Sequence, residues 1–299
     1  MIYTLTISPA IDYVKHISCM QAGATNRSSK EEYYLGGKGI NVTSVLEQLD
    51  VKSVALGFVA GFTGKALEDG LHEQGIKTDF VHLANGITRI NVKIKSGIET
   101  EINGQGPIPS ESEFDMLADK LNALSPGDTL ILSGNIPNGL PDDTYDKLLI
   151  IVSSGNIRII VDTSGKLLLS TLKYHPFLIK PNLDELKAIM GEGIEPLSGA
   201  RKLQSLGARN VIVSLGSEGA VLLSEDGKDY FCKPPEGKVL NTVGSGDSMV
   251  AGFVAGYEMT GDCGYAFHLG SAASAATAFS PGLAKHDKIF ECLKAINKE

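Results

Sequence analysis

The residues best suited to chemistry lie in a glycine-rich turn, Asn241–Asp247, which ends in an aspartate. Apolar residues at helical spacing, beginning with Met249 and Phe253, follow at once, so the turn is predicted to lead into a helix N-terminus. Such an end presents unpaired N–H groups and partial positive charge, which suit a phosphate. Asp247 could either cap this helix or take a proton from a hydroxyl that attacks phosphorus, and the motif alone leaves both interpretations open.

Two further motifs precede predicted helices and also allow two interpretations. Gly36–Asn41 is either a flexible turn with a solvated lysine or a substrate loop. In the second case the glycines permit close backbone approach, Lys38 supplies a cation and Asn41 recognises a hydroxyl. Asn182 and Glu185 are three residues apart and share a helix face, so they form either a helix cap or oxygen ligands for a partly hydrated Mg²⁺.

The turn Ser214–Gly219 closes a predicted strand and is either a plain hairpin turn or a backbone wall for a nucleotide. Two better-known nucleotide motifs are absent from the sequence. Gly64-Lys65 lacks the spacing and the Ser or Thr of a P-loop, and Met249 stands where a dinucleotide fingerprint needs its third glycine.

Strand-like and helix-like segments alternate along the chain, which predicts a doubly wound α/β fold with a mostly parallel sheet flanked by helices. The predicted strands are Met1–Ser8, Val51–Phe58, Thr129–Ser133, Ile157–Asp162, Phe177–Lys180 and Asn210–Leu215. The predicted helices are Asn41–Leu49, Lys65–Gln74, Glu111–Leu124, Asp142–Ser153, Asp184–Met190 and Gly199–Leu206. Ligands of such sheets bind beyond the carboxyl ends of the strands, where Ser133, Asp162, Lys180 and Ser214 lie.

Two segments, at about residues 12–35 and 88–104, break this alternation and favour β-strands. We interpret residues 1–299 as one domain in which these two insertions form a small β-sheet lid. Arg89 and Lys93 are four residues apart in a predicted strand and therefore share a face. Charges on a solvated sheet face are common, but these segments could also supply partners for a substrate phosphate: Asp12, Arg27, Arg89 and Lys93.

Composition narrows the range of partners. The chain has 299 residues and a net charge of −8, without a basic block, which argues against nucleic acid as a partner. No apolar run is long enough to span a membrane, and the start of the chain reads as a strand and not as a signal peptide. Four scattered cysteines are typical of reduced thiols in a cytoplasm, and no histidine pair has metal-ligand spacing.

Taken together, the motifs resemble those of the ribokinase-like (PfkB) sugar kinases over nearly the whole chain. Gly36–Asn41 is similar to the N-terminal signature of that family, Asn241–Asp247 to its C-terminal signature, and Asn182-x-x-Glu185 to its magnesium motif, all in the same order. One departure is Ser8, where the family pattern has Asn before Pro9. The resemblance implies a ribokinase-like fold, ATP as co-substrate and Mg²⁺ as cofactor.

The resemblance also implies roles for individual residues. Asp247 would be the base, and the backbone of Gly244, Ser245, Gly246 and Asp247 would form an anion hole. Asn182 and Glu185 would orient Mg²⁺. The ATP site would include Lys180, Ser214, Gly216, Ser217, Glu218, Gly219, Gly246 and Asp247, with the Ala-rich helix after Gly264 against the base. Sugar hydroxyls would contact Asp12, Gly37, Lys38, Asn41 and Asp247, and Arg27, Arg89 and Lys93 would bind the sugar phosphate.

Within the family, Thr88–Lys93 and Gly246–Gly252 most resemble the bacterial kinases that phosphorylate fructose 1-phosphate at O6. The tagatose-6-phosphate kinases are next nearest in resemblance. Either end of a ketofuranose could face Asp247 while the phosphate meets the cations, so only the configuration of the ring hydroxyls separates the two substrates. A sugar-phosphate sensor without catalysis is the alternative from another class. The exposed lid sheet could in addition pair across a homodimer.

Overall fold

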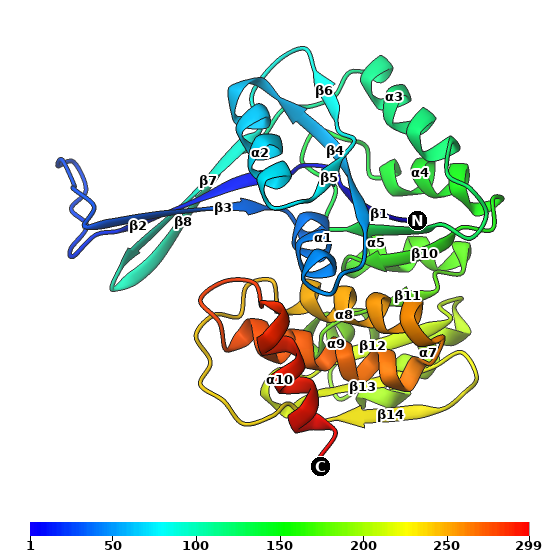
Figure 1. The fold of residues 1–299 in the computed structure, drawn as a ribbon. Coiled ribbons are helices and arrows are strands. Elements are labelled where there is room, and N and C mark those ends of the chain that lie inside the picture. Colours follow the sequence, from blue (N-terminus) through cyan, green and yellow to red (C-terminus); the bar gives the residue numbers. More distant parts are fainter. Residues whose placement is uncertain (299) are drawn as a thin grey trace.

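The computed structural model describes residues 1–298, and a large, mostly parallel sheet forms its centre (Figure 1). Its strands are β1 (Ile2–Thr6), β4 (Ser53–Ala60), β5 (Lys77–Thr78), β6 (Val81–Leu83), β9 (Thr129–Ser133), β10 (Arg158–Asp162), β11 (Leu178–Ile179), β12 (Asn210–Ser214), β13 (Ala220–Leu223) and β14 (Asp229–Cys232). Their order is β14-β13-β12-β11-β10-β9-β1-β4-β5, and β6 pairs with β4. Strand β13 pairs antiparallel with both β12 and β14, and the other strand pairs of this sheet are parallel. The predicted doubly wound, mostly parallel fold is confirmed.

Helices cover both faces of this sheet. The first face carries α1 (Lys38–Gln48), α8 (Ser245–Thr260), α9 (Cys263–Ala278) and α10 (His286–Ile296). The second carries α3 (Glu111–Asn122), α4 (Thr144–Ser153), α5 (Gly165–Thr171), α6 (Leu183–Met190) and α7 (Pro196–Ser205). Helix α2 (Gly61–Glu73) packs in a third, separate hydrophobic cluster. Two short 3-10 helices are η1 (Leu172–Tyr174) and η2 (Gly216–Glu218).

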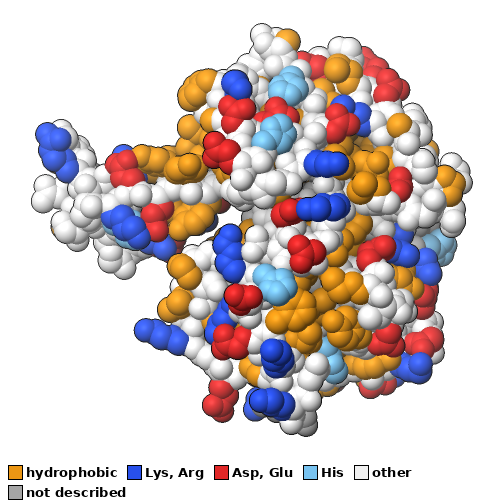
Figure 2. Space-filling view, viewed as in Figure 1, with side chains coloured by type: hydrophobic (Ala, Val, Ile, Leu, Met, Phe, Trp, Pro, Cys, Tyr) orange, Lys and Arg blue, Asp and Glu red, His pale blue; other side chains and the backbone are white. Residues whose placement is uncertain are grey.

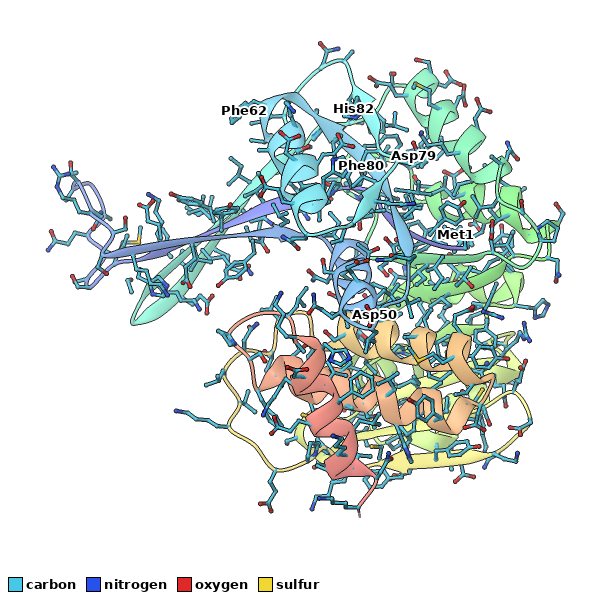
Figure 3. All side chains as sticks on the ribbon, in the orientation of Figure 1. Met1, Asp50, Phe62, Asp79, Phe80 and His82 are labelled. Atoms are coloured by element: carbon cyan, nitrogen blue, oxygen red, sulfur yellow. The ribbon has the colours of Figure 1, made fainter. Side chains whose placement is uncertain are left out.

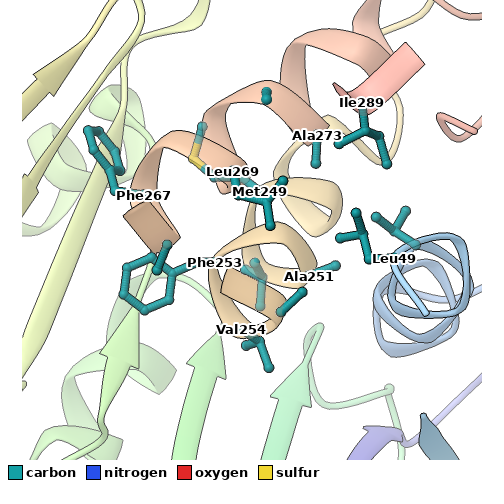
Figure 4. Packing of buried hydrophobic residues seen from close by; sticks show 14 of the residues in the cluster. Leu49, Met249, Ala251, Phe253, Val254, Phe267, Leu269, Ala273 and Ile289 are labelled. Carbon is teal, nitrogen blue, oxygen red and sulfur yellow. The ribbon is translucent and has the colours of Figure 1, made fainter. Parts of the chain in front are cut away.

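Helix α8 is held firmly, which matters because its N-terminus belongs to the Gly-rich turn. Phe253 and Val254 are buried between α8 and the sheet (Figure 4). On its other side α8 lies close against α9, because a Cβ on Gly252 would come within 2.6 Å of the Leu269 carbonyl oxygen. Glycine at this position therefore permits the contact of the two backbones.

A second sheet projects from the body (Figures 1 and 2). It contains β2 (Ala10–His16), β3 (Lys30–Gly36), β7 (Arg89–Ser96) and β8 (Ile98–Asn103), in the order β3-β2-β7-β8. We call these four strands the small sheet. No helix in residues 1–298 is both long enough and apolar enough to cross a bilayer.

Candidate active site

A cavity of about 440 Å³ lies where the carboxyl ends of the parallel strands meet the small sheet and the start of α8. Its position is the one expected for ligands of a doubly wound sheet. Residues far apart in the sequence line it: Ala10, Asp12, Gly37, Lys38, Asn41, Arg89, Asn91, Asp162, Lys180, Asn182, Glu185, Ser214, Val243, Gly244, Gly246 and Asp247.

The N-terminus of α8 offers an anion-binding surface to this cavity. Gly244 precedes the helix with a φ of 79°, and a Cβ there would come within 2.6 Å of the Leu283 side chain, so glycine is required. Within residues 1–298, the backbone N–H groups of Gly246 and Asp247 have no hydrogen-bond partner. Unpaired N–H groups at a helix N-terminus attract negative charge.

Asp247 is buried beside these N–H groups, with 6% of its surface exposed. Its Oδ2 accepts a hydrogen bond of 2.7 Å from Nδ2 of Asn41, and it makes no capping bond, so the capping interpretation is wrong. Burial and then the charge of Asp162 raise the pKa of Asp247 to about 6, against the opposing effects of Asn41, Lys38 and Lys180. A carboxylate with such a pKa is well suited to accept a proton near neutral pH.

Asp162 lies between two lysines of the cavity. Its carboxylate oxygens are 3.3 Å from Nζ of Lys38 and 3.4 Å from Nζ of Lys180. Burial alone would raise the pKa of Asp162, but the two ammonium groups, Lys180 first, hold it below its usual value. Burial alone would lower the pKa of Lys38, but the negative charges of Asp162, Asp247 and Glu185 outweigh the effect of burial and raise this pKa.

The loop before α1 reaches the cavity, as the substrate-loop interpretation predicts. Gly37 has a φ of 129°, and a Cβ on it would come within 2.7 Å of the Thr6 side chain. This close approach seats the start of α1 against the end of β1 and brings Lys38 and Asn41 to the cavity. A larger residue than glycine would push the loop away.

Asn182 and Glu185 form the capping box of α6 and also line the cavity. Asn182 Oδ1 accepts from the Glu185 N–H, and Glu185 Oε2 accepts from the Asn182 N–H, both at 2.8 Å. The capping interpretation is therefore confirmed. It does not exclude a role for the two residues as Mg²⁺ ligands, because Oε1 of Glu185 has no hydrogen-bond partner in the described part of the chain. No group of three or more His, Cys, Asp or Glu side chains in residues 1–298 is placed to hold a metal ion. Oxygen donors of this kind fit Mg²⁺, which keeps several waters and is held by one or two protein oxygens together with phosphates.

Asp12, Arg89 and Asn91 reach the cavity from the small sheet. Asn91 is opposite Asp12 in the paired strands, and its Nδ2 donates to Asp12 Oδ1 at 2.7 Å. Arg89 Nε donates to the Ser8 carbonyl at 3.2 Å. The guanidinium therefore provides a fixed cation on the small-sheet side of the cavity.

Some predicted site residues do not line the cavity. Arg27 is exposed in the long loop between β2 and β3, and Lys93 is paired with Glu101 of the next strand, with 3.4 Å between Nζ and Oε1. The hydroxyl of Ser245 donates to the Ser274 carbonyl of α9. Ser214 lines the cavity. The other residues of the predicted nucleotide wall lie in and just after η2 and do not line the cavity: Gly216, Ser217, Glu218 and Gly219.

Comparison with known proteins is consistent with this geometry. The profile of the pfkB family carbohydrate kinases matches residues 2–288. The chain belongs to this family. It is 43% identical to the 1-phosphofructokinase of Bacillus subtilis, over 99% of this chain and 98% of that protein. It is 38% identical to the D-tagatose-1-phosphate kinase of Bacillus licheniformis, over 97% and 96%.

Solved structures show the same fold. Phosphofructokinase-2 of Escherichia coli, crystallised with substrates and products, has a TM-score of 0.92 at 28% identity, covering 99% of both chains. The ribokinase of Arabidopsis thaliana has a TM-score of 0.78 at 20% identity, covering 98% of both chains. The expected ribokinase-like fold is thus confirmed, and the chain is a carbohydrate kinase, a phosphotransferase with ATP as co-substrate.

Proposed function

We propose that this kinase transfers the γ-phosphoryl group of ATP to O6 of D-fructose 1-phosphate, giving fructose 1,6-bisphosphate. The observation that carries the proposal is the placement of Asp247. Its buried carboxylate lies beside two unpaired N–H groups, and a fixed cation, Arg89, stands on the small-sheet side of the same cavity. A sugar phosphate whose acceptor hydroxyl meets Asp247 can therefore place its phosphate at Arg89.

In the proposed reaction the O6 hydroxyl attacks the γ-phosphorus while Asp247 accepts the hydroxyl proton. The bond between the γ-phosphorus and the β,γ-bridging oxygen breaks, and ADP leaves. The N–H groups of Gly246 and Asp247 stabilise the charge that develops on the transferring group. Phosphoryl transfer depends mainly on positioning and electrostatics, so a proton acceptor with a pKa of about 6 is sufficient. Lys180 adds a cation on the nucleotide side together with Ser214, and both residues line the cavity.

The ring hydroxyls face the remaining polar groups of the cavity. Asp12 can accept hydrogen bonds, and Lys38 and Asn41 can donate them. Asn91 already donates to one oxygen of Asp12, which fixes the direction of that carboxylate. We propose that the small sheet acts as a lid and excludes water when sugar phosphate binds.

Bound Mg²⁺ would neutralise charge on the phosphates of ATP, and we propose that Asn182 and Glu185 hold it, in part through waters. Glu185→Gln should raise the Mg²⁺ concentration for half-maximal activity by roughly tenfold, because one anionic donor is lost. Glutamine can still close the capping box, so stability should change little. Titration of activity with Mg²⁺ measures the effect.

Asp184→Asn is the matched control for this titration, since Asp184 is the exposed acidic neighbour on α6 and does not line the cavity. Its Mg²⁺ dependence should equal that of the wild type. An unchanged Mg²⁺ requirement in Glu185→Gln would remove Glu185 from the metal site.

Product identity tests the proposed reaction against the sensor alternative. We expect fructose 1-phosphate and ATP to give ADP and a bisphosphate that fructose-1,6-bisphosphate aldolase cleaves. Binding of fructose 1-phosphate without consumption of ATP would support the sensor. The retained acid Asp247 and the pair Asn182 and Glu185 favour catalysis, because a binding protein needs neither a base nor a metal site.

Tagatose phosphates are the second candidate substrate, and a relative of 38% identity is named D-tagatose-1-phosphate kinase. Tagatose 1-phosphate and tagatose 6-phosphate each have a free hydroxymethyl group at one end of the furanose ring and a phosphorylated one at the other. Either compound could direct a hydroxyl to Asp247. The higher identity to a 1-phosphofructokinase, 43%, favours fructose 1-phosphate.

We propose that the outer face of the small sheet pairs with a second copy of the chain. Tyr33, Ile98 and Ile102 are 67%, 80% and 58% exposed. Val92 is opposite Ile102 and Tyr13 is opposite both Val92 and Tyr33, so these side chains share one face. Hydrophobic side chains are visible on the projecting small sheet (Figure 2). Phe62 of α2, which is 73% exposed, lies on the side of the body from which the small sheet projects (Figure 3).

The molar mass measured by light scattering should therefore be twice the 31.7 kDa of one chain. The variant Ile98→Lys/Ile102→Lys should shift the mass toward one chain, because charge in a buried apolar interface is costly. Lys95→Glu, an exposed change on the same sheet but on its other face, serves as the control. A wild type that remains monomeric at assay and at high concentration would contradict pairing.

A further inference from the structure

The proposed reaction gives a role to Lys180 but none to Asp162, with which Lys180 forms a buried ion pair. Only 3% of the Asp162 side chain and 7% of the Lys180 side chain are exposed, and their charged atoms are 3.4 Å apart. A buried charge is strongly unfavourable without a partner, so neither side chain can leave the other easily. Lys38, which is 44% exposed, approaches the other oxygen of Asp162 at 3.3 Å.

The pair places the Lys180 ammonium directly at the anion-binding N-terminus of α8. A Cβ on Gly246 would come within 2.9 Å of Lys180 Nζ, so the glycine makes room for this ammonium group. The cation is therefore adjacent to the unpaired N–H of Gly246. A fixed cation in a water-poor site stabilises a transferring phosphoryl group far more than a mobile one in water.

The same carboxylate also acts on Asp247 through its charge. Three charged groups of the cavity affect Asp247: Asp162 from the end of β10, Lys38 from the start of α1, and Lys180 from just after β11. Asp162 raises the pKa of Asp247, whereas the two lysines and the Asn41 amide lower it. Removal of one of these charged groups should therefore shift the pKa of Asp247, in a direction set by the sign of the charge removed.

We propose that Asp162 is a positioning residue of this kinase: it holds Lys180 against the anion hole and Lys38 beside the substrate, and its negative charge favours proton transfer to Asp247. The inference rests on the proposed function, since it assumes that Asp247 accepts the proton and that the phosphoryl group lies at α8. Asp162 itself need not touch the reacting atoms. Its effect is exerted through the two lysines and through the field at Asp247.

The pH dependence of kcat/KM separates this role from a structural one. The wild type should lose activity as the pH falls through about 6, because protonated Asp247 cannot accept a proton. Asp162→Asn should lower kcat by about tenfold and move this acid limb to lower pH. Lys180→Met should also lower kcat, but it should move the limb to higher pH, because it removes a cation and leaves the Asp162 charge.

Asp69→Asn is the matched control, because Asp69 forms an exposed ion pair of 2.9 Å with Lys65 on α2, outside the cavity. It should leave both kcat and the acid limb unchanged. If Asp162→Asn fails to fold with an uncompensated lysine, Lys180→Met and the double variant Asp162→Asn/Lys180→Met still test the proposal. The double variant should have a reduced kcat and an acid limb close to that of the wild type.

A titration of Asp247 by ¹³C NMR, with labelled aspartate and Asp247→Asn for assignment, gives the same information without turnover. Opposite shifts of its midpoint in the two single variants would support the proposal. Equal midpoints in the wild type and both variants would overturn it, whether or not sugar phosphate is turned over. Failure of the proposed function would instead appear as a wild type that phosphorylates no sugar phosphate.

Discussion

Asp247→Asn is expected to lower kcat by roughly 10²–10⁴-fold, which is the usual size of a general-base effect. An amide cannot accept the O6 proton, yet it has nearly the shape of the carboxylate and can still present an oxygen to the Asn41 amide that contacts it at 2.7 Å. The KM values for sugar phosphate and ATP should therefore change only modestly. Steady-state assay of ADP release measures all three quantities.

The control for this variant is Asp262→Asn at the start of the next helix. Asp262 caps α9 by accepting from the Tyr265 N–H, and asparagine caps a helix equally well. Its kinetics should equal those of the wild type, and both variants should keep the wild-type melting temperature within a few degrees. A kcat for Asp247→Asn within about threefold of wild type would exclude Asp247 as the base.

Arg89→Ala is the second change with a large expected effect. It should lower kcat/KM for the sugar phosphate by about 100-fold, chiefly through KM, because charge-assisted hydrogen bonds to the phosphate are lost. The acidic chain, with its net charge of −8, must hold an anionic substrate with such local cations. The KM for ATP should change by less than about threefold, since Arg89 lies on the small sheet and not at the nucleotide side.

Lys95→Ala is the matched control for Arg89, as an exposed cation on the same strand that does not line the cavity. It should have wild-type kinetics. Equal increases in the KM for ATP and for sugar phosphate in Arg89→Ala would contradict the assignment of the substrate phosphate to this residue.

The sequence predicts the fold well where the hydrophobic pattern is regular. The parallel strands β9, β10 and β12 occur at or within one residue of the predicted bounds, because each is a short buried run of apolar residues. The strand predicted for Phe177–Lys180 is observed only at Leu178–Ile179. Lys180 lies just beyond the observed strand and pairs with Asp162, so the charged end of the predicted run belongs to the cavity and not to the strand.

The ends of helices are predicted less well. Helix α2 begins at Gly61 and not at Lys65, and α1 begins at Lys38 and not at Asn41. Both begin within glycine-containing turns, where local propensity argues against helix. At α1 tertiary contact decides instead, since Gly37 and Gly39 pack closely on Thr6.

The sequence indicates most of the cavity but not its charge balance. Motif residues such as Lys38, Asn41 and Asp247 meet there although more than 200 residues separate the first from the last. The sequence places Asp162 at a strand end where ligands bind and Asn91 within the segment Thr88–Lys93, but it predicts no role for either residue. Their ion pairs and hydrogen bonds depend on strand neighbours that a single sequence does not reveal.

The most direct test of the proposed substrate is Mg²⁺-dependent ADP release with ATP and a panel of acceptors, compared as kcat/KM. The panel contains fructose 1-phosphate, fructose 6-phosphate, tagatose 1-phosphate, tagatose 6-phosphate and the unphosphorylated sugars. We predict that fructose 1-phosphate exceeds every other acceptor by tenfold or more, about 1.4 kcal/mol of transition-state discrimination. A higher kcat/KM for either tagatose phosphate would contradict the proposed substrate, and no turnover with any acceptor would contradict catalysis itself.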